Sequence, residues 1–289
     1  MVIDQQTQIR INRFIQKMPP LPLTVSKVLE VTRNPKTDAK ALNDVVSLDP
    51  VLTGKVLKLV NSAYYSLSNQ VTSLVRAIIM LGINTVKNLV LSTAVISTVK
   101  KAENFNALDM DSFWKHSIGV GVISKKLAQS MKIDPKKLEE YFVAGLLHDI
   151  GKIPLNAEVS DEYIKAISYA RQNKAQFSII ETEFFGLNHA DIGIRISELW
   201  KLNKPLHYTI QYHHAIDDCP DEYREFVAVI SLANIIACRS NIGFAGDSVP
   251  AQDEDKLMEI TQLKWKDIED VESSAEDAIK KAMIFLNLI

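Results

Sequence analysis

Two side chains that can bind metal ions and transfer protons stand next to each other in the stretch GLLHDIGKIP, residues 145–154. Adjacent residues on a helix diverge by about 100°. His148 and Asp149 therefore flank a wedge in which one ion can take a ring nitrogen and a carboxylate oxygen, while a second ion could share the carboxylate. Ala144 and Gly145 lie one turn earlier and are small enough to let another helix approach closely. These features favour a metal site at the end of this helix.

The residues that follow allow two interpretations. Gly151 is expected to end the helix, and Lys152 is then placed to meet an anion near the metal. The alternative is an ordinary helix end, in which His148 satisfies terminal carbonyl groups and Lys152 complements the helix dipole.

His116, earlier in the chain, is also expected to point into the protein core. His116 falls in register with Phe113 and Val120 on an apolar helix face, so we expect it to point inward. A single inward histidine is usually a hydrogen-bonded core residue. It becomes a candidate ligand only together with His148 and Asp149.

The remaining histidines follow the pair along the chain. His189 stands near a helix start in GLNHADIG, and His213 and His214 are adjacent in IQYHHAI. Taken separately, His189 is typical of a cap or surface residue, and His213 and His214 of one buried and one solvated residue. His207 is typical of a half-exposed position on an amphipathic helix. Together with the earlier residues they favour a shared site.

The donor types limit the metal. Imidazole and carboxylate ligands suit Fe, Mn or Zn better than Mg or Ca, which prefer shells made of oxygen alone. We therefore expect a divalent transition metal as cofactor, with one or two ions. The alternative is that no metal binds and that hydrogen bonds hold the histidines.

Helical patterns dominate the elements that must position these residues. Asp49 with Pro50, and Asp134 with Pro135, have the form of an N-cap followed by proline at the first helical position. Gly82 breaks a long apolar stretch into two helices. Because alternating strand patterns are absent, the sequence predicts an all-α fold.

Polar segments divide the chain. The stretch KKAENFNALDM, residues 100–110, predicts a boundary between an amino-terminal helical part, 1–105, and a larger histidine-bearing bundle, 106–289. The stretch 241–255 predicts a long surface loop. The apolar residues of NSAYYS, 61–66, are expected to pack between the two parts.

Composition excludes several classes of protein. The chain has 289 residues, 47% of them hydrophobic and 24% charged, which is typical of a globular protein. Its formal charge of -2 is spread without a Lys/Arg block, so we expect no direct nucleic-acid binding. Two cysteines, Cys219 and Cys238, are too few for a disulfide framework and favour a reducing, cytoplasmic environment.

Other patterns are also missing. No apolar stretch has the length of a signal peptide or a membrane span, so no membrane association is expected. The chain lacks a glycine-rich phosphate loop, a nucleophile elbow and a Cys placed with a His. Nucleophilic catalysis and the common kinds of nucleoside-triphosphate binding are therefore unsupported.

Three segments carry a family resemblance. MPPLPLTVSKVLEVTRNP (18–35), VSLDPVLTGKVLKLVNSAYYS (46–66) and SLVRAIIMLGINTVKNLVL (73–91) resemble the HDOD family. Its members are bacterial output and regulatory domains related to the HD-domain metal-dependent phosphohydrolases. The resemblance runs over residues 15–240 and implies an all-helical fold, with an amino-terminal helical subdomain packed on an HD-like bundle.

The wider HD superfamily resemblance implies roles for individual residues. His116 matches the first metal-ligand histidine, and His148 and Asp149 match the doublet that gives the superfamily its name. Asp149 would bridge the ions if two are bound. Lys152 matches the lysine of the HDIGK run in HD-GYP cyclic-dinucleotide phosphodiesterases, where it helps to hold phosphate.

The resemblance continues in the second half of the chain, with two departures. His189, His213 and His214 match further histidine ligands of the HD-GYP group. Asn234 stands where the superfamily has its last ligand, an aspartate, and a neutral amide is a poorer ligand than a carboxylate. The segment AIDDCPDEYREF, which follows His214, lacks the GYP motif. These departures argue against cleavage of a cyclic dinucleotide and leave metal binding in place.

Two functions follow as hypotheses. The first is a regulatory output protein that acts on signalling protein partners, with a metal site of structural or sensory kind and no strong catalysis. The second is a metal-dependent phosphohydrolase or phosphodiesterase with a nucleotide or cyclic dinucleotide as ligand. In it, Asp149 holds the metal that activates a bound water, Lys152 balances phosphate charge, and His189 or a neighbouring residue transfers a proton. A scaffold with vestigial histidines is the third reading.

Overall fold

The computed structural model describes residues 5–99, 106–247 and 252–287. Within these ranges the chain forms helices and no strand, so the predicted all-α fold is confirmed. The helices are α1 Gln5–Lys17, α2 Leu23–Val31, α3 Ala39–Val46, α4 Pro50–Val60, α5 Leu74–Leu81, α6 Ile83–Val99, α7 Met110–Ser130, η1 Pro135–Lys137, α8 Leu138–Leu147, α9 Lys152–Glu158, α10 Ser160–Asn173, α11 Phe177–Phe185, α12 His189–Leu199, α13 Lys204–Tyr212, η2 Ile216–Asp218, α14 Asp221–Arg239, α15 Glu254–Thr261, α16 Trp265–Ala282 and α17 Ile284–Asn287.

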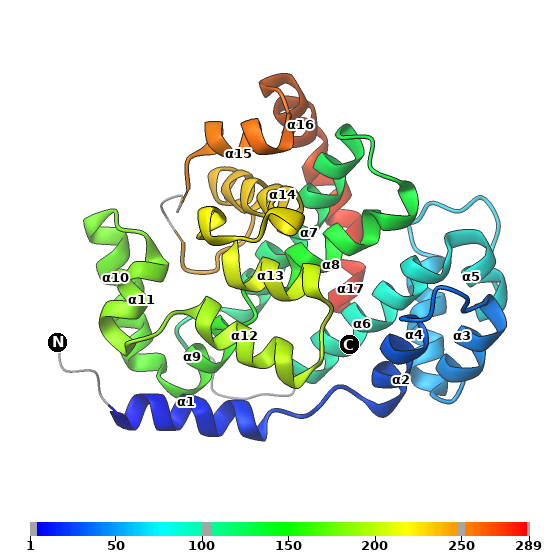
Figure 1. The fold of residues 1–289 in the computed structure, drawn as a ribbon, viewed down its shortest axis with the longest axis horizontal. Helices are drawn as coiled ribbons and strands as arrows, with labels where there is room; N and C mark the ends of the chain where they lie inside the picture. Colours follow the sequence, from blue (N-terminus) through cyan, green and yellow to red (C-terminus); the bar gives the residue numbers. More distant parts are fainter. Residues whose placement is uncertain (1–4, 100–105, 248–251, 288–289) are drawn as a thin grey trace.

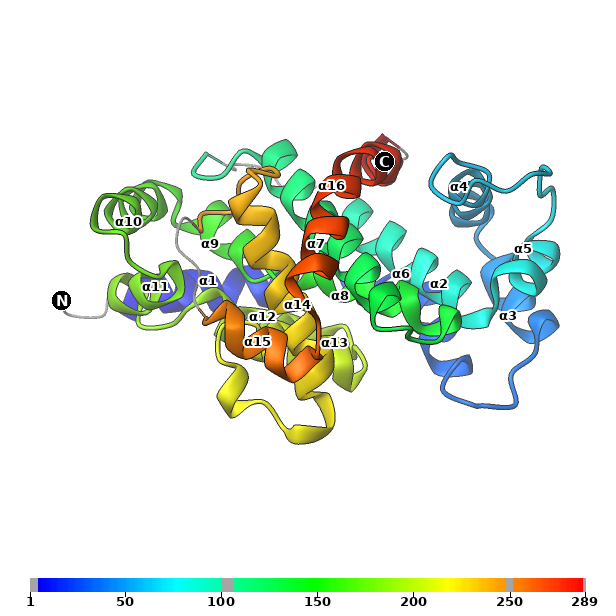
Figure 2. The same cartoon turned by 90° about the horizontal axis from the view of Figure 1, so that it is seen from above.

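The helices form an elongated molecule with a central bundle. Helices α2 to α5 gather at one end and α10 and α11 at the other, with α7, α8 and α14 between them (Figures 1 and 2). The long helix α6 joins the α2–α5 end to the central bundle, because it packs against α4 and against α8. Helix α1 packs against α9, so the first helix of the chain contacts the histidine-bearing part. Of the predicted boundary 100–110, residues 100–105 lie outside the described residues.

Capping residues fix where the helices begin. The Asp49 carboxylate accepts a hydrogen bond from the Leu52 backbone N–H at 2.9 Å, and Pro50 is the first residue of α4, as predicted. Gly82 separates α5 from α6 with a φ of +88°, a backbone conformation that favours glycine. Asp134 begins the short η1 helix rather than α8, which starts one turn later at Leu138.

The central contact is the crossing of α7 and α8. Gly121 of α7 and Gly145 of α8 face each other so closely that a Cβ on Gly145 would lie 2.6 Å from the Cα of Gly121. Glycine at both positions therefore lets the two backbones touch. Helix α14 packs on both helices and α16 covers α7. The expectation that small residues beside the His-Asp pair admit a second helix is confirmed.

The two tyrosines of the NSAYYS segment, Tyr64 and Tyr65, are half-buried and pack against the core, while Asn61, Ala63 and Ser66 are exposed. The Tyr64 ring packs against Phe142 of α8 at a centroid distance of 5.7 Å, and its hydroxyl accepts a hydrogen bond from Lys125 of α7 at 3.2 Å. Lys125 also forms an ion pair with the buried Glu139. These contacts hold the amino-terminal helices against the two helices that lead to the histidines.

Among the described residues, no helix is by itself both long enough and apolar enough to cross a membrane. Helices α5 and α6 meet that test only as a pair, and they bend by 118° where they join.

Candidate metal centre

The His-Asp pair stands in the tight turn that directly follows α8, with His148 as the C-cap residue of that helix. We expected the helix to run to Gly151, but α8 ends at Leu147. The Ile150 N–H donates to the Leu147 carbonyl at 3.0 Å and the Lys152 N–H to the Asp149 carbonyl at 2.9 Å, so the chain turns with hydrogen bonds across three residues. The turn packs on α12 at Gly151, where a Cβ would come within 2.7 Å of the Gly193 nitrogen.

His148 presents one ring nitrogen to the centre. Its Nδ1 donates a hydrogen bond to the Gly145 carbonyl at 2.6 Å. Its Nε2 is buried without a hydrogen-bond partner, 3.3 Å from Asp149 Oδ2. Because the Nδ1 bond fixes the tautomer, Nε2 keeps a lone pair that can bind a metal.

His116 and Asn234 face the same space from α7 and α14. The His116 Nε2 lies 3.0 Å from Asn234 Oδ1, and its Nδ1 lies 3.3 Å from the Ile242 carbonyl oxygen. The His116 and His148 rings are 5.6 Å apart. The predicted ligand His116 therefore reaches the centre, although its Nε2 is already engaged by the amide of Asn234.

His189 is held in place by a buried carboxylate. It is the first residue of α12, and both its backbone N–H and its Nδ1 donate to Glu181 Oε2, at 2.9 and 2.5 Å. The other oxygen of Glu181 accepts from the Tyr163 hydroxyl at 2.6 Å. His189 Nε2 then points at Asp149 Oδ1 from 3.3 Å. The reading of His189 as a cap or surface residue is wrong, because its side chain is 0% exposed.

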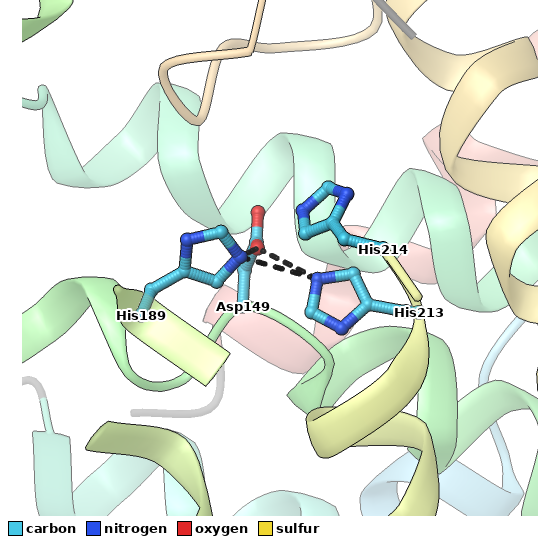
Figure 3. Close-up of side chains that lie close together, drawn as sticks. All are labelled: Asp149, His189, His213 and His214. Atoms are coloured by element: carbon cyan, nitrogen blue, oxygen red, sulfur yellow. Dashed lines mark hydrogen bonds and ion pairs between the residues drawn. The ribbon is translucent and has the colours of Figure 1, made fainter. Parts of the chain in front are cut away.

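His213 and His214 complete the cluster from the opposite side, just after α13 (Figure 3). His213 Nδ1 donates to the Thr209 carbonyl at 3.0 Å, which leaves Nε2 at 3.5 Å from Asp149 Oδ1. His214 Nε2 is buried without a hydrogen-bond partner. The sixth histidine, His207, instead bonds Ser197 at 2.6 Å and stays outside the cluster.

Lys152 is paired with two carboxylates. Its Nζ lies 2.8 Å from Asp149 Oδ2 and also forms an ion pair with Asp247, in the segment after α14. The lysine is fully buried, and its Nζ lies 5.6 Å from the centroid of the Phe177 ring. Sequence patterns did not single out Asp247 or Glu181, although both are in contact with predicted site residues.

Burial and neighbouring charges set the protonation of the ligands. Burial, reinforced by neighbouring His148, lowers the pKa of His116 to about 4, and burial lowers that of His213 to about 4. Burial also lowers the pKa of His214. Burial alone would raise the pKa of the Asp149 carboxyl, but His148 and Lys152 hold it well below its usual range. The three imidazoles are therefore neutral and the carboxylate is ionised near pH 7, the forms that bind metals.

Unlike the pKa values of His116, His213 and His214, the pKa of His189 is raised despite its burial, because the Glu181 carboxylate contacts its ring. Burial alone would lower the pKa of His189, but the Glu181 carboxylate holds it above its usual value. For Lys152, burial would lower the pKa, but Asp149 and Asp247 raise it. The lysine is therefore a permanent cation of the centre.

The residues present fit a metal ion. Two groups of candidate ligand atoms each lie within 4.8 Å of one another: Asp149, His189, His213 and His214 form the first, and His116, His148 and Asp149 form the second. The buried Asp149 Oδ1 is also without a hydrogen bond, an expensive state that an ion would relieve. All six predicted histidine and aspartate ligands are thus brought together, with Asn234 beside the second group.

The sequence matches the HDOD domain model over residues 18–216, which is more than half of the chain. The chain belongs to the HDOD family. An uncharacterized protein of Treponema pallidum (strain Nichols) is 25% identical over 224 residues, which cover 76% of this chain and 42% of that protein. The chain thus spans less than half the length of this curated relative.

Solved structures share the fold. An HDOD domain protein of unknown function from Geobacter sulfurreducens has a TM-score of 0.78 at 23% identity, covering 96% of this chain and 98% of its own. A Shewanella amazonensis SB2B protein, provisionally named a phosphohydrolase, has a TM-score of 0.71 at 24% identity, covering 96% and 97%. A Marinobacter aquaeolei VT8 protein, provisionally named a signal transduction protein, has a TM-score of 0.70 at 19% identity, covering 97% and 64%. At these identities the likeness shows the fold alone.

Proposed function

We propose that this HDOD protein is a regulatory output module of signal transduction whose buried centre holds one divalent transition ion, Fe, Mn or Zn. The ion serves a structural or sensory role, and the output acts on signalling protein partners. Family membership and the name of the Marinobacter neighbour support the regulatory part.

One observation carries the proposal: the centre is closed around its own charges. Lys152, the cation that an anionic substrate would need, is buried between Asp149 and Asp247. A catalytic metal site keeps an open position for water or substrate, whereas a structural metal site has its positions filled by protein groups.

The arrangement favours one ion over two. Asp149 Oδ1 faces His189 and His213, while Oδ2 is taken by the Lys152 ammonium. Nε2 of His116 is likewise engaged by Asn234. We therefore assign the ion to Asp149, His189, His213 and His214, and propose that the second group holds no ion of its own.

Ligand variants test this assignment directly. His189→Ala is expected to abolish binding of added Zn²⁺ or Mn²⁺ in isothermal titration, because it removes a ligand of the proposed ion. His116→Ala should leave a single binding event with less than about a threefold change in affinity. Equal losses in both variants would contradict the one-ion assignment.

A metal-dependent phosphohydrolase is the second candidate. The unpartnered, buried Asp149 Oδ1 and His148 Nε2 favour it, since they are typical of an incomplete metal cluster. In this reading Asp149 would help to hold an ion that supplies an activated water, Lys152 would balance phosphate charge, and His189 or a neighbouring residue would transfer a proton.

Restoring the missing carboxylate tests the second candidate. Asn234→Asp should raise the stoichiometry from one ion to two and raise hydrolysis of bis-p-nitrophenyl phosphate at least about tenfold if the site is a weakened enzyme. Unchanged stoichiometry together with no hydrolysis in either form would exclude this candidate.

A further inference from the structure

The segment that follows α14 lies over the metal centre, and two glycines, Gly243 and Gly246, allow it to approach the neighbouring residues closely. Gly243 has a φ of +63°, and a Cβ there would lie 3.0 Å from the His116 Cα and closer still to the Ser112 carbonyl oxygen. The next residue, Phe244, donates its backbone N–H to the same Ser112 carbonyl at 3.2 Å. The segment therefore rests directly on the turn of α7 that carries His116.

The second glycine sets the position of Asp247. Gly246 has a φ of +102°, and a Cβ on it would come within 2.5 Å of the Phe177 ring. Only glycine fits this contact without strain. The chain leaves it with the Asp247 side chain directed at Lys152, and the two side chains are 6% and 0% exposed. The ion pair is thus built into the fold rather than formed on the surface.

The Asp247–Lys152 ion pair affects the charge balance of the buried centre. Three carboxylates, Asp149, Glu181 and Asp247, are buried around one ammonium, that of Lys152. These four side chains carry a net charge of -2, which a single divalent ion would balance, and burying a balanced set of charges costs far less than burying an excess. Asn234 contributes no charge, so Asp247 completes the balance.

We propose that Asp247 seals the metal centre: its carboxylate occupies the face of Lys152 that a small anion such as phosphate would take, and it supplies the negative charge that Asn234 lacks. The proposal rests on the one-ion metal centre proposed above. An anion enters only by displacing Asp247, so the Asp247–Lys152 contact inhibits anion binding. The same contact slows loss of the metal ion, because the Asp247 carboxylate balances the positive charge of the centre.

The test compares Asp247→Asn with wild type and with Asp255→Asn. Asp255 is an exposed residue in the first turn of α15, so its substitution removes the same charge without touching the centre. Each protein is loaded with Zn²⁺ and its metal content measured. Binding of inorganic phosphate is then followed by isothermal titration, and release of the ion to excess EDTA by a colorimetric indicator. Asp247→Ser serves as a second variant if the amide disturbs folding.

Asp247→Asn is expected to keep its ion, bind phosphate at least about tenfold more tightly than wild type and release the ion at least about tenfold faster. Asp255→Asn should match wild type in both. Metal-loaded, folded Asp247 variants whose phosphate affinity equals that of wild type would overturn the seal while leaving the metal centre intact. A wild type that takes up no ion would overturn both proposals.

Discussion

Replacing Gly145 by alanine tests the helix crossing on which the centre depends. The added Cβ would lie 2.6 Å from both the Cα and the N of Gly121, whereas ordinary contacts begin at 3.4 Å. The obstacle is backbone, not a movable side chain, so α7 and α8 must separate by about 0.8 Å to admit it. Overpacking of this kind costs up to about 3 kcal/mol.

The expected size of the effect follows from two opposing terms. Alanine regains about 1 kcal/mol of helix propensity over glycine, which leaves a net loss of about 2 kcal/mol for Gly145→Ala. At roughly 2 to 4 °C per kcal/mol for a chain of this size, the Tm should fall by about 4–8 °C. Circular dichroism during heating, with metal removed from all samples, measures this shift.

Gly54→Ala is the matched control. Gly54 lies inside α4, and nothing comes within 4 Å of a Cβ placed there. Helix propensity alone then predicts a gain of up to about 1 kcal/mol and a Tm higher by about 2–4 °C. If Gly145→Ala also raised the Tm, the close backbone contact of α7 and α8 would be wrong.

Three further changes probe the supports of the centre. Glu181→Gln should weaken Zn²⁺ binding about 10–100-fold in isothermal titration, because Glu181 fixes the ring orientation and tautomer of His189; an unchanged affinity would show that this bond does not matter. Asn156→Ala should lower the free energy of unfolding in urea by about 2–4 kcal/mol, because the buried amide accepts a hydrogen bond from the Leu108 backbone N–H and donates one to the Leu108 carbonyl, just before α7. A loss below about 0.5 kcal/mol would contradict that role. Glu139→Gln should cost about 1–3 kcal/mol in the same assay, because it removes the buried carboxylate charge that pairs with the Lys125 ammonium. Restoration of stability by a second change, Lys125→Met, checks the pairing.

Helix boundaries were largely predictable because their signals are local. Asp49 and Pro50 act on the backbone within one turn, and Gly82 ends a helix through its own φ, so neither depends on distant residues. The end of α8 was misplaced for a tertiary reason. Gly151 is needed for contact with α12, and the sequence around it does not reveal that the turn begins at His148.

The candidate ligands were predictable from residue type and order, but their supports were not. Glu181 shares a helix face with Phe177, and a charged residue on an apolar face is a signal that could have identified it as buried. Asp247 has no such signal, because an acid after glycine is typical of any surface turn. Its role comes from packing against residues almost a hundred positions earlier in the chain.

Metal content tests the central claim most directly. Elemental analysis of protein purified without added metal compares wild type, the double variant His148→Ala with Asp149→Ala, and His207→Ala, which removes a histidine outside the centre. One Fe, Mn or Zn ion per chain in wild type and in His207→Ala, and none in the double variant, is the expected result. A folded wild type without metal, or a double variant that keeps its ion, would contradict the metal centre.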